Sequence, residues 1–228
     1  GLKPAGTEGF FQTARLTQLQ ATKEGFLLRA KSGGKTISVD AGKARLSVGP
    51  AVDLPDGEFY REQIGKEGVA WTERKEPVLL LDVPGGMTPQ LLRGHLEALR
   101  QSKWAGKAVI LLGLVPLSGT AMGAPSIPEF LVMAVSDENF VEWARGLPPG
   151  KVEGKLSLRV AAPLSREIVA RNVIGILEGS DDKLKDSYIL LSAHYDHLGV
   201  REGEKDSVFN GANDNASGVA SMLESAWW

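Results

Sequence analysis

A histidine and an acidic residue stand two positions apart at His194 and Asp196, and a second histidine follows at His197. They come after residues 188–191, an apolar run whose branched side chains are typical of a buried strand. The cluster is therefore expected where a strand ends in a loop, which is where α/β sheets collect ligands and catalytic groups. An imidazole nitrogen can bind a metal ion, while a nearby carboxylate accepts the other ring N–H and orients the ring.

A second polar cluster follows, in which Asp214 stands between Asn213 and Asn215, ahead of an apolar helical pattern. His194 and Asp214 together resemble half of a zinc site, because zinc takes imidazole nitrogen and carboxylate oxygen as ligands. A carboxylate can also bridge two metal ions about 3.5–4 Å apart, the spacing of two-metal hydrolysis. Each residue alone also has a structural explanation, Asp214 as a helix N-cap and His194 as a polar strand end. Their occurrence together, in this order, favours the metal site.

The chain ahead of these clusters alternates predicted strands and helices. Apolar runs at residues 78–82, 109–112 and 130–135 predict buried strands. Thr88 is a suitable N-cap for a helix after the first strand, and residues 136–138 cap a short helix after the third. This alternation is typical of an α/β fold.

Further strands and connections are predicted from alternation and from turn residues. The strands are expected at residues 11–29 (two strands), 36–39, 156–160 and 172–177. The turn or loop segments are expected at residues 31–35, 49–57 and 119–128.

The composition is that of an ordinary globular chain of 228 residues, with 43% hydrophobic and 24% charged residues. Its net charge of -2 gives no reason to expect a nucleic acid or an anionic membrane as partner. The absence of cysteine excludes disulfides and thiol chemistry. No apolar run is long enough to span a bilayer.

Three segments resemble one known enzyme family. Residues 170–175, 192–199 and 210–218 are similar, in order and spacing, to motifs of the zinc aminopeptidases related to bacterial leucyl aminopeptidase and aminopeptidase Y. The resemblance implies an α/β fold, namely a partial zinc-peptidase mixed sheet with helices, interrupted by an inserted α/β protease-associated domain. It also implies a peptide or protein substrate and an exported protein, periplasmic or extracellular.

The same resemblance implies roles for individual residues. His194 is expected to bind one zinc ion, and Asp214 is expected to bridge two. Asp196 is the expected catalytic residue that orients His194. His197 is expected either to contact substrate or to fix its loop by a backbone bond, and the amide of Asn213 is expected to form hydrogen bonds and not to bind metal.

The resemblance also divides the chain into three parts. Residues 1–55 correspond to the N-terminal part of the peptidase domain. Residues 56–162 resemble the protease-associated insert, whose most recognisable part is residues 127–137. Residues 163–228 correspond to the part of the peptidase domain that carries the first metal ligands.

The sequence departs from the family pattern after Asp214. The family has further acidic ligands, a last histidine and a glutamate general base, whereas the acidic residue that follows here is Glu224, on a predicted helix. His95 lies on a predicted helix of the insert and is expected to be a partly exposed helix residue. The chain is therefore expected to be an inactive fragment of a zinc aminopeptidase that binds zinc weakly or not at all.

Two alternatives remain open at this stage. The chain could be a non-catalytic module, whose insert recognises a peptide or protein or restricts access to a cleft. It could also belong to a carboxypeptidase or glutaminyl cyclase on the same scaffold. The sequence does not fix the residue specificity or the oligomeric state.

Overall fold

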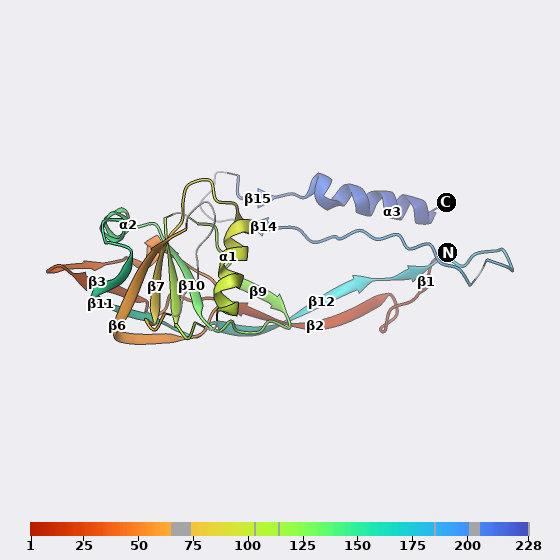
Figure 1. Cartoon of the computed structure of the whole chain (residues 1–228). Helices are drawn as coiled ribbons and strands as arrows, with labels where there is room; N and C mark the ends of the chain where they lie inside the picture. The colour runs from red at the N-terminus through yellow and green to blue at the C-terminus, as the bar shows by residue number, and fades with distance from the viewer. Residues whose placement is uncertain (65–73, 103, 114, 185, 201–205, 228) are drawn as a thin grey trace. The chain divides into compact units, whose positions relative to one another are not determined.

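The chain folds into two compact units. One comprises Gly1–Ala14 and Val169–Trp228, and the other comprises Arg15–Ile168. The structure is a computed structural model that describes residues 1–64, 74–102, 104–113, 115–184, 186–200 and 206–227 (Figure 1).

Strands outnumber helices in both units. The strands are β1 (Lys3–Pro4), β2 (Phe11–Gln20), β3 (Leu27–Ser32), β4 (Lys35–Ser38), β5 (Ala44–Leu46), β6 (Val52–Gln63), β7 (Val78–Asp82), β8 (Ala108–Leu112), β9 (Thr120–Gly123), β10 (Leu131–Val135), β11 (Gly150–Val160), β12 (Leu164–Val173), β13 (Gly175–Ile176), β14 (Gly199–Val200) and β15 (Val208–Phe209). The helices are α1 (Pro89–Gln101), α2 (Glu138–Arg145) and α3 (Ser217–Trp227), with short turns η1 (Ala41–Lys43) and η2 (Ala212–Ala216).

The larger unit is built on an eight-stranded mixed sheet with the order β4-β3-β11-β6-β7-β8-β10-β5. Strands β6, β7, β8 and β10 are parallel, and the other pairings are antiparallel. A separate three-stranded sheet has the order β12-β2-β9. The antiparallel strands flank a parallel centre, which makes the sheet mixed.

The central parallel strands are buried on both faces. In β7, Val78 and Leu80 pack into one hydrophobic cluster, whereas Leu79 and Leu81 pack into another. Successive residues of a strand point to opposite faces, so the two clusters lie on opposite sides of the sheet. This explains why the strand is a continuous apolar run without alternation.

Helices α1 and α2 cover these two faces (Figure 1). Helix α1 buries Leu92 and Leu99 against the second cluster, and α2 buries Phe140 against the first. Both begin at the predicted caps, because the Thr88 side chain accepts a hydrogen bond from the backbone N–H of Leu91 and Asp137 accepts one from that of Phe140.

Two predicted connections contain strands. Residues 49–57 were expected to form a turn-rich link, but β6 begins within them and runs beside β11. The pairing shifts register between Val152 and Leu156, and again between Leu156 and Leu158. These irregularities accommodate Pro55 and Gly57 inside a strand, where the residues would normally break the ladder. The predicted loop at residues 119–128 similarly contains β9, which pairs with β2.

A buried ionic group stands at the carboxyl ends of β6 and β7. Asp82 is paired with Arg61 (Oδ2 to Nη2, 3.4 Å) and with Arg145 of α2 (Oδ1 to Nε, 2.9 Å). Asp82 and Arg61 are 7% and 6% exposed, whereas the Arg145 side chain is about half exposed. The carboxylate therefore links the sheet to α2 from a largely desolvated position.

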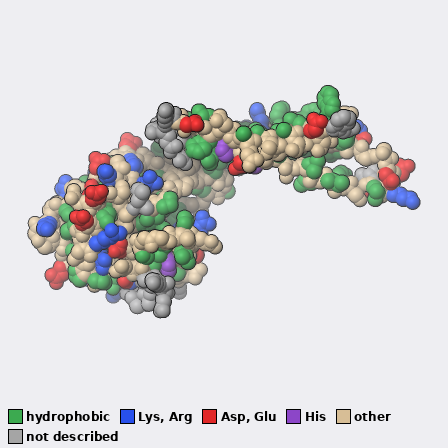
Figure 2. All heavy atoms as spheres, turned by 90° about the horizontal axis from the view of Figure 1, so that it is seen from above, with side chains coloured by type: hydrophobic (Ala, Val, Ile, Leu, Met, Phe, Trp, Pro, Cys, Tyr) green, Lys and Arg blue, Asp and Glu red, His purple; other side chains and the backbone are tan. Residues whose placement is uncertain are grey.

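The smaller unit contains short strand pairs and one helix. Strand β1 pairs with β13, β14 pairs with β15, and η2 leads into α3. The strand predicted at residues 188–191 is wrong: these residues form no strand, and Ile189 is 92% exposed. No described segment pairs with them, so their apolar side chains lie open to solvent. Hydrophobic side chains are visible on the surface in the space-filling view (Figure 2).

The grouping of residues differs from the predicted domain boundaries at the N-terminal side. Residues 15–55 belong with the middle segment, because β3 pairs with β11 and β5 pairs with β10. The protease-associated character of the middle segment stays a prediction. Among the described residues, no helix is long and apolar enough to cross a membrane.

Candidate metal centre

The pairing of β14 with β15 brings the two polar clusters together. Gly199 is opposite Phe209 in this ladder, so the chain that precedes β14 and the chain that follows β15 emerge side by side. His194 lies on the first of these segments, and Asp214 lies on the second, within η2. The antiparallel pairing of β14 with β15 therefore brings the segments that carry His194 and Asp214 next to each other.

His194 lies between two aspartates. Its Nε2 atom is 3.0 Å from Oδ1 of Asp214. Its Nδ1 atom is 3.0 Å from the backbone carbonyl oxygen of Asp196 and 3.3 Å from the Oδ1 atom of the same residue. The ring therefore has Asp214 at Nε2 and Asp196 at Nδ1, the two partners that the sequence predicts. At Nδ1, the backbone carbonyl of Asp196 is a closer acceptor than the Asp196 carboxylate.

This arrangement fixes the proton on the ring. The Asp196 carbonyl can only accept, so Nδ1 donates to it, and the lone pair of the neutral imidazole is then on Nε2. The hydrogen bond to that carbonyl raises the pKa of His194, the Asp214 carboxylate adds to the rise, and partial burial opposes it. Without a cation, Nε2 faces Oδ1 of Asp214 at 3.0 Å, a contact that a proton on Nε2 satisfies, so a metal ion at this position would replace that proton.

Glycine permits the close approach at two positions. Gly211 has φ = +66°, and a Cβ atom there would lie 3.0 Å from Cγ of His197. At Gly218, a Cβ atom would lie 2.3 Å from Oδ1 of Asn215. A side chain at Gly211 would press on His197 and on the backbone carbonyl of Asp214, and one at Gly218 would displace the Asn215 side chain.

The donor pair suits zinc by its chemistry, because zinc binds imidazole nitrogen and carboxylate oxygen. Two such ligands, each about 2.0–2.1 Å from zinc at a tetrahedral angle, are about 3.3 Å apart. The separation of 3.0 Å between Nε2 and Oδ1 is that of a direct hydrogen bond, so the two atoms would move slightly apart to hold a zinc ion. Among the described residues, however, no three His, Cys, Asp or Glu side chains gather to hold a metal ion. The two residues fit as part of a zinc site.

The remaining predicted polar residues have structural partners. The rings of His197 and Phe209 lie 6.3 Å apart, so His197 is held beside β15. The backbone carbonyl of Asn213 accepts a hydrogen bond from the Ser217 hydroxyl (3.0 Å). His95 is partly exposed on α1, as predicted.

Tyr195 is a positioning residue that the sequence reasoning missed. Its hydroxyl donates to the backbone carbonyl of Arg171 in β12. The bond attaches the His194 segment to the end of β12, where the predicted motif at residues 170–175 starts. A tyrosine flanked by a histidine and an aspartate was the available signal, because a phenol in a polar loop needs a hydrogen-bond acceptor.

The sequence of this segment matches a known family. Residues 172–227 match the profile of Peptidase family M28. The matched residues include His194, Asp196 and Asp214. None of the curated proteins matches the chain significantly.

Solved structures provide a second comparison. An aminopeptidase from Aneurinibacillus sp. strain AM-1 is similar with a TM-score of 0.52 and 19% identity, over 94% of this chain and 47% of that chain. A zinc aminopeptidase from Bacillus subtilis is matched with a TM-score of 0.36 and 18% identity, over 94% and 46% of the two chains. The chain therefore spans about half the length of the structures it matches. The first similarity confirms the predicted α/β fold with a mixed sheet and helices.

Proposed function

We propose that this chain is part of a zinc-dependent aminopeptidase that hydrolyses N-terminal peptide bonds at a dinuclear zinc site. The observation that carries the proposal is the convergence of His194 Nε2 and Asp214 Oδ1, with Asp196 at the other ring nitrogen. The match with Peptidase family M28 supports hydrolysis of peptide bonds as the reaction class.

In the proposed site, His194 would hold one zinc ion through Nε2, and Asp214 would contact both ions through its carboxylate. Zinc, when bound, supplies Lewis acidity that polarises the scissile carbonyl. Asp196 keeps the proton on Nδ1 and so presents the Nε2 lone pair. Catalytic zinc sites have three protein ligands, so a further donor must join His194 and Asp214 in the active protein.

The proposed domain organisation and export of the protein follow from its proposed assignment as a zinc aminopeptidase. Residues 56–162 would be the protease-associated insert, and the protein would be exported. The alternatives on the same scaffold are a carboxypeptidase, which would hydrolyse the bond at the other end of the peptide, and a glutaminyl cyclase, which would cyclise an N-terminal glutamine without breaking a peptide bond.

Release of amino acids from peptides by the full-length protein tests the proposal. Peptides with a free N-terminus should lose their first residue, and N-acetylated copies should be resistant. His194→Ala and Asp214→Asn should each lower kcat/KM by at least about a hundredfold, because each removes a metal contact. His95→Ala is the matched control and should keep wild-type activity, since His95 lies on α1 outside the site.

Two results would contradict the proposal. Cleavage of the acetylated peptides at the opposite end would assign a carboxypeptidase, and unchanged turnover in Asp214→Asn would remove the carboxylate from the reaction. Asp196→Asn should reduce activity by only about tenfold, the low end for a residue that supports a metal ligand, because the backbone carbonyl remains in place.

A further inference from the structure

One asparagine of the chain is followed directly by glycine. The asparagines are Asn139, Asn172, Asn210, Asn213 and Asn215, and the residue after Asn210 is Gly211. The backbone nitrogen of the residue after an asparagine can attack the side-chain amide, and a Cβ atom on that residue hinders the approach. Glycine has no Cβ atom and the widest backbone freedom, so this pair is the least hindered in the chain.

The surroundings of Asn210 leave both reacting groups available. Asn210 is exposed and comes directly after β15, outside any strand or helix. Neither its side-chain amide nor the N–H of Gly211 has a hydrogen-bond partner among the described residues. The carbonyl oxygen of Gly211 accepts a hydrogen bond from the N–H of Ala216 (3.0 Å), which involves neither reacting group.

Two asparagines of the regular elements are restrained by specific contacts. The Asn172 side chain donates to Oε1 of Gln12 (3.0 Å), and a β-branched valine follows it in β12. The residue after Asn139 is Phe140, whose N–H donates to the carboxylate of Asp137 (3.0 Å). In the first case the amide is engaged, and in the second the attacking nitrogen is engaged.

The asparagines of η2 are also hindered. Ala216 follows Asn215, and its N–H donates to the carbonyl oxygen of Gly211. Asn213 is followed by Asp214, whose Cβ atom stands in the way of attack on the Asn213 amide. Asn210 therefore differs from its close neighbours in the chain by its contacts as well as by the glycine that follows it.

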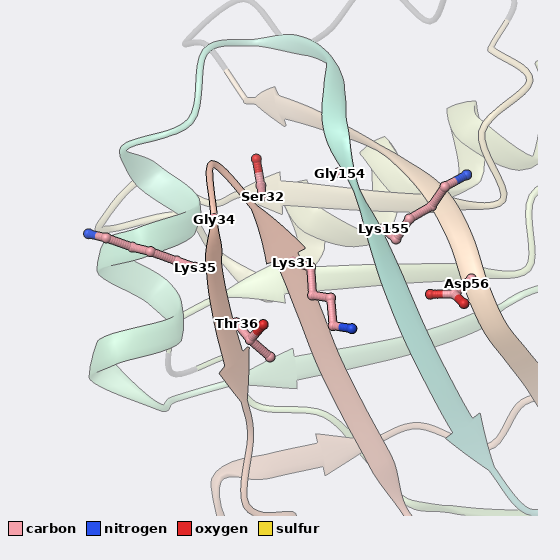
Figure 3. Close-up of a pocket in the computed structure, with 8 residues that line it drawn as sticks. All are labelled: Lys31, Ser32, Gly34, Lys35, Thr36, Asp56, Gly154 and Lys155. Carbon is pink, nitrogen blue, oxygen red and sulfur yellow. The ribbon is translucent and has the colours of Figure 1, made fainter.

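Asp56 and Gly57 form a comparable pair in the larger unit, because an aspartate can react in the same way with loss of water. Asp56 extends from β6 beside β11, at the shallow hollow next to the β3–β4 hairpin (Figure 3). Gly57 is buried and stands opposite Leu156 in the ladder of β6 with β11. The sheet holds this backbone extended, which opposes the turn that ring closure needs.

We propose that Asn210 is a deamidation site. The Gly211 nitrogen loses its proton to hydroxide and attacks Cγ of Asn210. The bond between this nitrogen and Cγ forms, the Cγ–Nδ2 bond breaks, and ammonia leaves after taking a proton from water. A second water molecule then opens the succinimide ring at either carbonyl, which gives aspartate or isoaspartate.

The modification changes the backbone ahead of the candidate metal centre. Isoaspartate adds one carbon to the main chain before Gly211. There is little room for this, because a Cβ atom on Gly211 would lie 3.0 Å from Cγ of His197 and 3.1 Å from the carbonyl oxygen of Asp214. Isoaspartate therefore displaces the segment that holds Asp214 near His194. Its effect on catalysis rests on the proposed function, whereas the modification itself does not.

Peptide mapping of the 228-residue chain after incubation at mildly alkaline pH tests the proposal. Cleavage after Lys205, at mildly acidic pH to stop further attack, releases residues 206–228 with Asn210, Asn213 and Asn215 in one peptide. Fragmentation should locate a mass gain of about 1 Da on Asn210, at least about tenfold more abundant than on Asn213 or Asn215. In water labelled with oxygen-18 the gain should be about 3 Da, because the new oxygen comes from water.

Two variants separate Asn210 from the rest of the chain. Asn210→Gln should remove the mass gain at this position, because a glutamine side chain would have to close a larger ring. Asn139→Gln is the matched control at an exposed position on α2, and the gain on Asn210 should stay within about twofold of wild type.

Several outcomes would overturn the proposal. They are no mass gain on Asn210, equal gains on Asn213 and Asn215, or an undiminished gain at position 210 in Asn210→Gln. Aspartate without isoaspartate would also overturn it, because direct hydrolysis of the amide gives one product and the succinimide gives two. None of these measurements depends on peptidase activity, so the proposed function and this modification can fail separately.

Discussion

Loss of the Asp82 carboxylate should destabilise the larger unit strongly. The variant Asp82→Ala removes the acceptor from Arg61, which is 6% exposed and whose Nε atom has no hydrogen-bond partner among the described residues. Removal of one partner from a buried ion pair costs about 3–5 kcal/mol, because the remaining charge stays desolvated. The 3.4 Å contact to Arg61 is long for a hydrogen bond, which favours the lower end. The half-exposed Arg145 contact adds at most about 1 kcal/mol.

Urea unfolding measured by tryptophan fluorescence is the assay. Trp104 and Trp143 both pack in the larger unit, so their emission reports on its core. An expected loss of about 3 kcal/mol corresponds to a midpoint shift of about 1–3 M urea at the usual slopes for small proteins. The matched control is Asp53→Ala, whose exposed pair with Arg159 should contribute less than about 1 kcal/mol.

Two results would refute this reasoning. Equal midpoints for Asp82→Ala and Asp53→Ala would show that burial of the first pair does not matter energetically. A double variant, Asp82→Leu/Arg61→Met, should recover part of the loss, since an apolar pair leaves no buried charge. A double variant that is less stable than Asp82→Ala would show that the pair acts through packing and not through charge.

Three further predictions concern the core, the sheet and the metal. Phe140→Ala, at a side chain that is fully buried in α2, should lower the unfolding free energy by about 3–5 kcal/mol in the same urea assay. Lys155→Glu should leave the urea midpoint nearly unchanged, because attraction to Lys31 on the opposed strand is offset by repulsion from Glu58, whose carboxylate Lys155 favours. After dialysis, the 228-residue chain should retain less than one zinc ion per molecule by atomic absorption, because His194 and Asp214 provide two ligands of the usual three or four. Stoichiometric zinc would contradict the last prediction.

The parts of the fold that sequence reasoning predicted correctly are those with a local cause. Residues 78–82 form a strand because an apolar run between polar flanks suits a strand buried on both faces. Helix α1 begins where the Thr88 side chain can cap it, which depends on residues within one turn. Such elements can be predicted from their own residues, because no distant pairing partner decides their structure.

The errors arose where a distant partner decides the structure. Strand β6 continues through Pro55 and Gly57 because β11 shifts its register to match, and nothing in residues 49–57 alone indicates this. The apolar run at residues 188–191 lacks a partner among the described residues and so forms no strand. The turn residues of the first segment predicted a loop and the apolar residues of the second predicted a strand, and in each case the presence or absence of a pairing partner gave the opposite structure.

The sequence predicted which residues make up the candidate site, but not all of the contacts between them. Motif spacing indicated that His194 and Asp214 would be neighbours, and the structure places their side chains 3.0 Å apart. The closer acceptor on Nδ1 is the carbonyl of Asp196, which every residue type possesses and which sequence therefore cannot single out. The hydroxyl bond of Tyr195 to β12 likewise depends on a backbone atom.

The ion pair between Arg15 and Glu167 has a consequence for the order in which the chain folds. The two residues are 152 positions apart in the sequence and their charged atoms are 2.6 Å apart, at the two ends of the larger unit. That unit is one continuous stretch, so it can fold during synthesis before the segment with His194 emerges from the ribosome. Once it has folded, β1 and β13 are separated by an effective loop of only about 20 residues, which lowers the entropy cost of their pairing by about 2 kcal/mol. Folding of the larger unit thereby shortens the loop that the β1–β13 pairing has to close.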